Sequence, residues 1–141
     1  MSNNFIPLSA NELVKRIFNI PKVDLANLPT PLEFLPNISK ELEINLFIKR
    51  DDCTGLAFGG NKTRHLEFIM HKAKIGDYDC ILTGAATQSN WCRQTAAAAN
   101  KLGLETFLVL MSGVKSNKMQ GNFLLYNILG VQVDVVEGEN L

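Results

Sequence analysis

Apolar and polar residues recur along positions 62–136 in a pattern of alternating helices and strands. The first predicted helix, at 62–75, has an apolar face formed by Leu66, Ile69, Met70 and Ala73. The same pattern predicts strands at 80–82, 106–110 and 131–136 and helices at 89–102 and 119–129. Three glycines are expected to terminate the helices: Gly76, Gly103 and Gly130. Strand–helix–strand units with short links indicate a parallel sheet with helices packed on it, so the predicted fold class is α/β.

The N-terminal part of the chain has a less regular pattern. A short helix is predicted within 8–19, where Ser9 followed by Glu12 resembles a capping box. Two prolines within 28–32 predict a rigid, extended segment, because proline restricts both itself and the residue before it. The apolar run at 45–49 predicts one further strand.

Composition narrows the classes of partner. The 141 residues are 46% hydrophobic and carry 14 basic and 14 acidic side chains, and this charge balance argues against a nucleic-acid partner. No apolar run approaches the about 20 residues that cross a membrane, and the polar start of the chain lacks a signal core. We therefore expect no membrane partner and a cytoplasmic location.

The three cysteines, Cys53, Cys80 and Cys92, are odd in number and widely separated. This spacing matches neither a disulfide framework nor a zinc site, and we expect no metal. Reduced and mostly buried thiols are the prediction.

A glycine-rich stretch at 54–65 joins the strand predicted at 45–49 to the following helix, and it places Lys62 where the loop becomes helical. The adjacent glycines Gly59 and Gly60 permit positive φ and a close approach of the backbone to a ligand. Three interpretations fit this stretch: a plain loop with a solvated lysine, a phosphate-binding P-loop, or a lysine that forms an imine.

The P-loop interpretation fails on one position. Gly55 and Gly60 have the required separation, but Asn61 stands where the phosphate-binding lysine belongs. A charged segment precedes the loop, and Arg50 with Asp51 either faces water or braces the loop as a buried pair.

A second loop, at 83–90, joins the carboxyl end of a predicted strand to the start of a helix, where open α/β sheets usually bind ligands. Ser89 or Thr87 can cap that helix. Uncommitted N–H groups at the same point can accept a substrate carboxylate. For Ser89, both a capping role and a ligand-binding role stay open.

Two motifs carry a resemblance to a known family. They are Lys49-Arg50-Asp51-Asp52 followed by Gly-Leu-Ala-Phe-Gly-Gly-Asn-Lys-Thr-Arg, and Gln88-Ser89-Asn90 with Arg93-Gln94-Thr95-Ala96-Ala97. This sequence resembles the pyridoxal-phosphate enzymes that comprise D-cysteine desulfhydrase and 1-aminocyclopropane-1-carboxylate deaminase, which share the tryptophan synthase β-like fold type II. The resemblance covers roughly residues 28–136 and implies pyridoxal 5'-phosphate as the cofactor.

The resemblance implies roles for five residues. Lys62 would hold the cofactor covalently and act as a base once released, and Asn61 would also contact the cofactor. Ser89 would hold the substrate carboxylate or act close to the reacting carbon, and Asn90 would bind the cofactor's ring oxygen and lie in the substrate site. Trp91 would also lie in the substrate site, although relatives usually carry a polar residue there.

The implied activity is that of a lyase or deaminase acting on a small amino acid, most like D-cysteine desulfhydrase, which forms pyruvate, ammonia and sulfide. The alternatives are 1-aminocyclopropane-1-carboxylate deaminase and a truncated, non-catalytic α/β module. A homodimer is expected for the full-length protein. One further departure is His65, which stands where relatives frequently have a second lysine.

Family members are much longer chains, and their phosphate cradle and pyridine-nitrogen partner come from sequence after the position of Leu141. We therefore expect these residues to be a fragment that is inactive alone. Residues 1–65 would be the N-terminal part of an incomplete cofactor domain, and 66–141 a small α/β domain.

Overall fold

The computed structural model describes residues 7–112 and 118–137. Its helices are α1 (Ala10–Phe18), α2 (Pro36–Leu42), α3 (Lys62–Ile75), α4 (Asn90–Lys101) and α5 (Gly121–Ile128). Its strands are β1 (Leu32–Phe34), β2 (Phe47–Lys49), β3 (Cys80–Ala86), β4 (Glu105–Ser112) and β5 (Gln132–Glu137). Two short 3₁₀ helices, Asp51–Thr54 and Leu56–Phe58, lie between β2 and α3.

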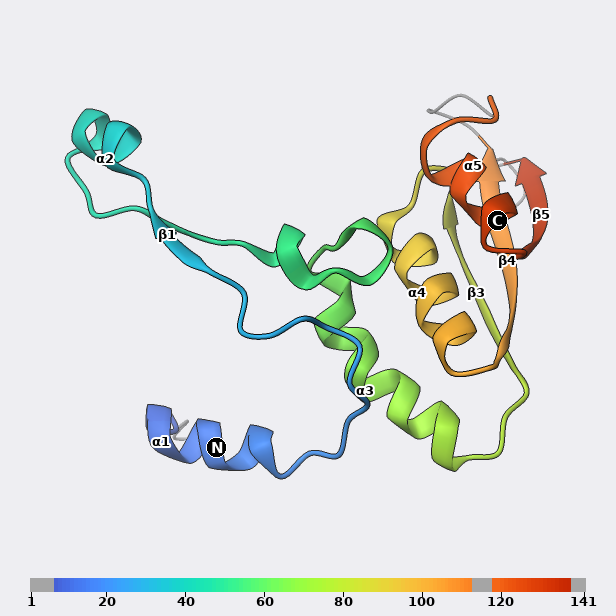
Figure 1. The fold of residues 1–141 in the computed structure, drawn as a ribbon, viewed down its shortest axis with the longest axis horizontal. Helices are drawn as coiled ribbons and strands as arrows, with labels where there is room; N and C mark the ends of the chain where they lie inside the picture. The colour runs from blue at the N-terminus through green and yellow to red at the C-terminus, as the bar shows by residue number, and fades with distance from the viewer. Residues whose placement is uncertain (1–6, 113–117, 138–141) are drawn as a thin grey trace, which may run out of the picture.

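Strands β3, β4 and β5 form a parallel sheet in that order, with Leu82 opposite Phe107 and Phe107 opposite Gln132. Helix α4 connects β3 to β4 and packs on both strands, and α3 packs on α4 (Figure 1). The predicted α/β class with a parallel sheet is therefore confirmed. Two strands are longer than predicted, because β3 runs to Ala86 instead of ending at residue 82, and β4 covers Glu105–Ser112 instead of 106–110.

Two buried clusters hold this part of the chain together. One joins α3, α4 and the segment before β1, and it contains Val23, Leu25, Leu66, Met70 and Ala98. The other joins α4, β4 and α5, and it contains Cys92, Leu108, Leu110 and Tyr126. Four small residues, Ala96–Ala99, are buried between them on α4 and let the helices and sheet approach closely.

The N-terminal elements lie apart from the sheet. Figure 1 shows β1 and α2 on the side of the molecule opposite β3–β5. Strand β1 pairs antiparallel with β2, Leu32 lying opposite Lys49, and α2 connects the two. The strand predicted at 45–49 is confirmed as β2, whereas β1 and α2 were not predicted. Three residues of β1 are too few to establish an apolar alternation.

Three local predictions have different outcomes. Gly103 and Gly130 adopt φ of 75° and 69°, which confirms them as helix terminators. Helix α3 also ends at Gly76, but Gly76 was expected at the left-handed position that follows the cap. Gly76 is instead the C-cap itself, with φ −85°, and Asp77 takes the left-handed conformation at φ 54°. Aspartate tolerates this conformation better than most residues.

The cysteine prediction is also corrected. Cys92 is buried in the second cluster, but Cys53 and Cys80 are exposed. Cys80 opens β3 at an exposed edge position, where the apolar periodicity of the strand gives no burial. The domain boundary expected after residue 65 falls inside α3, and it stays a prediction. No helix within 7–112 or 118–137 has the length and apolar character to cross a membrane.

Candidate functional site

Lys62 is the first residue of α3, at the end of a strongly bent loop. Four consecutive residues of this loop have positive φ: Ala57 at 44°, Phe58 at 69°, Gly59 at 72° and Gly60 at 131°. Positive φ costs about 1 kcal/mol or more at a non-glycine residue. The loop must therefore be stabilised by contacts that compensate for this strain.

The two glycines make room for the chain itself. A Cβ on Gly59 would collide with the carbonyl oxygen of Asp52, and a Cβ on Gly60 would lie 2.5 Å from Gln94 Nε2. From the sequence, we expected the space left by the missing side chains of Gly59 and Gly60 to face a ligand. The structure shows that it is filled by backbone and side-chain atoms of the same chain.

The buried hydroxyl of Thr54 holds the two ends of the loop together. Its Oγ1 accepts from the Gly60 N–H at 2.9 Å and lies 3.0 Å from the carbonyl oxygens of both Asp51 and Gly60. The Gly60 N–H also donates to the Asp51 carbonyl at 2.8 Å. These bonds close the loop immediately before Lys62, so they fix where the backbone of Lys62 lies relative to the loop.

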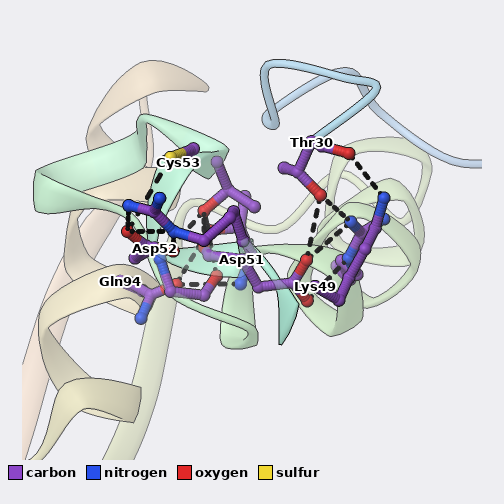
Figure 2. A network of polar contacts seen from close by, with 11 residues as sticks. Thr30, Lys49, Asp51, Asp52, Cys53 and Gln94 are labelled. Atoms are coloured by element: carbon purple, nitrogen blue, oxygen red, sulfur yellow. Dashed lines mark hydrogen bonds and ion pairs between the residues drawn. The ribbon is translucent and has the colours of Figure 1, made fainter. Parts of the chain in front are cut away.

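The carboxylate of Asp51 adds a second set of contacts. Arg64 donates to it twice, at 2.9 Å from Nε and 2.7 Å from Nη2, and the Thr30 hydroxyl lies 3.2 Å away. Hydrogen bonds from Arg64 hold the pKa of Asp51 below its usual value. Figure 2 shows Asp51 between Thr30 and Lys49 on one side and Gln94 on the other.

Of the two alternatives for Arg50, the buried pair with Asp51 does not form. Arg50 instead pairs with the exposed carboxylates of Glu33, at 3.0 Å, and Asp52, at 2.6 Å. Asp51 does brace the loop, but its partner is Arg64, in the first turn of α3. Asp51, just after β2, and Arg64 on α3 meet only because the loop between them folds back.

Gln94 joins this loop to α4. Its side-chain oxygen accepts from the Thr63 N–H at 2.9 Å and from the Thr63 hydroxyl at 2.7 Å. Gln94 is 1% exposed, and Thr63 is fully buried beside Lys62. The start of α3 is therefore attached to a second rigid element, one residue from the candidate lysine.

Lys62 itself is half-buried, and its amine makes no hydrogen bond or ion pair with any residue that the structure describes. The neighbouring Asn61 is exposed and makes no side-chain capping bond, and His65 is exposed on α3. A lysine whose amine has no carboxylate partner keeps it available as a nucleophile. This donor set fits the covalent attachment of an aldehyde cofactor.

The second loop ends at Ser89, which is the N-cap of α4. Its Oγ accepts from the Cys92 N–H at 3.2 Å, so the predicted cap is Ser89 and not Thr87. As an acceptor, the hydroxyl keeps its own proton for another partner. Capping and ligand binding are therefore compatible at Ser89.

The next two residues differ in their exposure. Asn90 is exposed, and its side-chain oxygen accepts from Asn122 Nδ2 at 2.9 Å. Trp91 donates from Nε1 to the Thr83 hydroxyl at 3.0 Å and packs against both buried clusters. The indole N–H is thus already used within the chain.

Arg93 brings the two loops together. Its Nη2 donates to the Gly59 carbonyl at 3.0 Å, and its Nη1 donates to the Asn122 side-chain oxygen at 3.1 Å. Burial lowers the pKa of Arg93, and no carboxylate pairs with it within the described residues. Lys62 and the Ser89–Asn90 pair are consequently held by one helix, α4.

Sequence reasoning assigned no role to Arg93, Gln94 or Asn122. The first two lie inside the second motif, so their positions carried a signal. Asn122 lies on α5 and is only 9% exposed. A single asparagine in an amphipathic segment is normally expected on the surface, and nothing in the sequence distinguished Asn122 from such a residue.

Residues 23–140 match the family described as pyridoxal-phosphate dependent enzyme. The chain belongs to this family. The pyridoxal-phosphate enzymes similar to it include the D-cysteine desulfhydrase of Klebsiella pneumoniae strain 342, which is 41% identical over 128 residues, covering 88% of this chain and 39% of the relative. A Pyrococcus horikoshii protein that carries the name of a 1-aminocyclopropane-1-carboxylate deaminase is 41% identical over 120 residues, covering 85% of this chain and 36% of the relative.

A solved structure gives the same result for the fold. The chain matches a structure described as an ACC deaminase homologue with a TM-score of 0.83 and 38% identity, covering 92% of this chain and 39% of the other. The fold is that of a fold type II pyridoxal-phosphate enzyme, and the family's cofactor is pyridoxal 5'-phosphate. The chain spans a little over a third of the length of these relatives.

Proposed function

We propose that the protein to which these residues belong is a pyridoxal-phosphate-dependent lyase or deaminase for a small amino acid, with Lys62 as the residue that holds the cofactor. The observation that carries the proposal is the amine of Lys62, which has no partner among the described residues although the loop and helix around it are fixed by buried hydrogen bonds. An amine without a partner in rigid surroundings favours a catalytic role for Lys62 over a structural one.

The residues present suit one part of the cofactor, its covalent attachment. When bound, pyridoxal phosphate supplies an electron sink that makes a Cα proton of an amino acid acidic. Lys62 Nζ is the group we assign to remove that proton. Asn61, exposed next to it, is assigned to contact the cofactor.

The second loop is assigned to bind substrate and cofactor oxygens. The hydroxyl of Ser89 and the free N–H groups at the start of α4 would hold the substrate carboxylate, helped by the helix dipole. Asn90 would donate to the cofactor's ring oxygen and border the substrate. Trp91 would contribute an apolar surface only, because its N–H is already donated to Thr83.

D-cysteine is the substrate we favour. Its conversion with one water to pyruvate, ammonia and hydrogen sulfide balances in atoms and needs no oxidant. The curated relatives named as D-cysteine desulfhydrase support this choice. The alternative substrate is 1-aminocyclopropane-1-carboxylate, which the other named relatives support.

We further propose a cytoplasmic homodimer without nucleic-acid or membrane partners, following the family resemblance and the charge balance.

The experiment needs the length that the relatives have and this chain lacks. In a chimera, these 141 residues replace the matching segment of the Klebsiella pneumoniae D-cysteine desulfhydrase. Borohydride reduction after loading with pyridoxal phosphate, followed by peptide mapping, should place the label on Lys62. The variant Lys62→Ala should take up no label, and Lys72→Ala on the same helix should be labelled normally.

Label on another lysine, or none in a loaded and folded chimera, would contradict the assignment of Lys62. Assays of the loaded chimera with D-cysteine and with 1-aminocyclopropane-1-carboxylate then separate the two substrates. If neither is turned over while Lys62 is labelled, the non-catalytic α/β module becomes the better description of this segment.

A further inference from the structure

Asn122 connects α5 to the loop that carries the proposed ligand-binding residues. Its backbone N–H donates to the Gln88 side-chain oxygen at 2.9 Å. Its Nδ2 donates to the Gln88 carbonyl at 2.8 Å and to Asn90 Oδ1 at 2.9 Å. Its Oδ1 accepts from Arg93 Nη1 at 3.1 Å. Every hydrogen-bonding group of its amide thus has a partner.

Two partners of Asn122, the Arg93 guanidinium and the Gln88 carbonyl, determine which side-chain atom is the oxygen and which is the nitrogen. The guanidinium of Arg93 can only donate, so the atom of Asn122 that faces it must be the oxygen. The Gln88 carbonyl can only accept, so the atom that faces it must be the nitrogen. The orientation of the Asn122 amide therefore has a single solution.

This orientation is passed on to Asn90. Because Asn122 presents its NH₂ group, Asn90 must present its oxygen toward Asn122. The Nδ2 of Asn90 then lies on the other side of the side chain, and it donates to no residue that the structure describes. Asn90 is exposed at the first position of α4, next to the Ser89 cap.

We infer that Asn122 is a positioning residue that fixes the Asn90 amide with its NH₂ directed outward, as a hydrogen-bond donor for a ligand oxygen. The inference rests on the proposed function, in which that oxygen belongs to the cofactor ring. An asparagine free to rotate would present its oxygen half of the time and would repel such a ligand. Fixing the amide removes that wrong orientation before the ligand arrives.

Holding the backbone of the loop does not require the contact with Asn90. The side chain of Gln88 ties the loop to the start of α5, because it bonds both to the Asn122 N–H and, at 3.1 Å, to the Gln120 carbonyl. Tyr126 of α5 adds a bond from its hydroxyl to the Ser89 carbonyl at 2.9 Å. The Asn122–Asn90 contact sets only the orientation of a side chain.

The decisive variant is Asn122→Asp, which keeps the shape and the acceptor for Arg93 but removes both donors. In this variant, Asn90 should turn its NH₂ toward the new carboxylate and its oxygen outward. The matched control is Asn127→Asp on the same helix, which removes a donor to the Phe123 carbonyl and does not contact Asn90.

The first readout needs no cofactor. In NMR spectra of the 141-residue chain, side-chain amide protons of Asn122 should exchange with water on the order of fivefold more slowly than those of Asn90. In Asn122→Asp the Asn90 protons should become the protected ones, and Asn127→Asp should leave them unchanged. Protected Asn90 protons in the unmodified chain would overturn the inference, even if the variant failed to fold.

The second readout is the affinity of the chimera for pyridoxal phosphate. Asn122→Asp should weaken it by about tenfold, because a donor is replaced by an acceptor, and Asn127→Asp should not. Combining Asn122→Asp with Asn90→Ala should weaken binding no further than Asn90→Ala alone. Additive losses would overturn the positioning role.

Failure of every chimera to bind the cofactor would instead contradict the proposed function. The hydrogen-exchange result would still decide the orientation of the Asn90 amide.

Discussion

The two loops that lead into α3 and α4 reach their shapes in different ways. The loop before Lys62 has four consecutive residues with positive φ, and it is closed by its own Thr54 and Asp51. The loop between β3 and α4 is only 87–89 in the structure, all of it described, and it includes no residue with positive φ. That loop is held to α5 by contacts of Gln88, Asn122 and Tyr126.

This difference predicts where substitutions act. In the first loop, backbone strain and buried hydrogen bonds determine the shape. Substitutions there should reduce the stability of the fold more than they alter the chemistry of Lys62. In the second loop, an ordinary backbone leaves side chains such as Ser89 free for ligands, so changes should reduce activity more than stability. The predictions below test this contrast, from the largest expected effect to the smallest.

Gly59→Ala should lower the free energy of unfolding by about 3 kcal/mol, because the new Cβ collides with the Asp52 carbonyl at a residue with positive φ. Gly103→Ala is the matched control. Gly103 has nearly the same φ, 75° against 72°, but nothing lies within 4 Å of its added Cβ. That variant should lose only about 1 kcal/mol. Urea denaturation of both chains measures the difference, and equal losses would show that the close approach to Asp52 is unimportant.

Ser89→Ala should lower turnover of D-cysteine by the chimera about 10²-fold, because the substrate carboxylate loses a positioning group. Loss of the cap should cost only about 1 kcal/mol of stability. Ser9→Ala provides a reference, since Ser9 caps α1 in the same way and lies away from the site. Steady-state kinetics beside a thermal melt separates the effects. A destabilised Ser89→Ala variant with normal specific activity would return Ser89 to a purely structural role.

Asp51→Asn should lower the free energy of unfolding at neutral pH by about 1 kcal/mol, a value reduced for the partial exposure of the pair with Arg64. Because the folded state lowers the pKa of Asp51, the stabilisation is fully present above the unfolded-state pKa, near 3.9, and is lost as pH falls through the lower folded value. The difference between the two chains should therefore shrink below about pH 4.

Urea denaturation at several pH values measures this convergence. A gap that stays constant into the acid range would mean that the Asp51–Arg64 ion pair contributes nothing that depends on charge. Asp52→Asn is a useful comparison, because Asp52 pairs with Arg50 at a more exposed site, with 58% of its side chain accessible against 22% for Asp51. Its effect should be smaller at every pH.

Local features of the sequence determined much of the second half of the molecule. The apolar period of 3.6 residues predicted α3 and α4, and short apolar runs predicted β3, β4 and β5. The caps Ser9 and Ser89 and the placement of Lys62 at a helix start were also readable. Each of these signals is contained within one helical turn or one strand, where the interacting residues are close in sequence.

The tertiary structure alone decided which residues hold the candidate site together. Asp51 pairs with Arg64 instead of its neighbour Arg50, and Gln94 reaches Thr63 across 31 positions of sequence. Asn122 reaches Asn90 across 32 positions. Strand β1 pairs with β2 although each has only three residues, too few for a clear apolar pattern. A polar side chain has many equally suitable partners along a chain, and only the packing of α3, α4 and α5 on the sheet brings one of them within hydrogen-bonding distance.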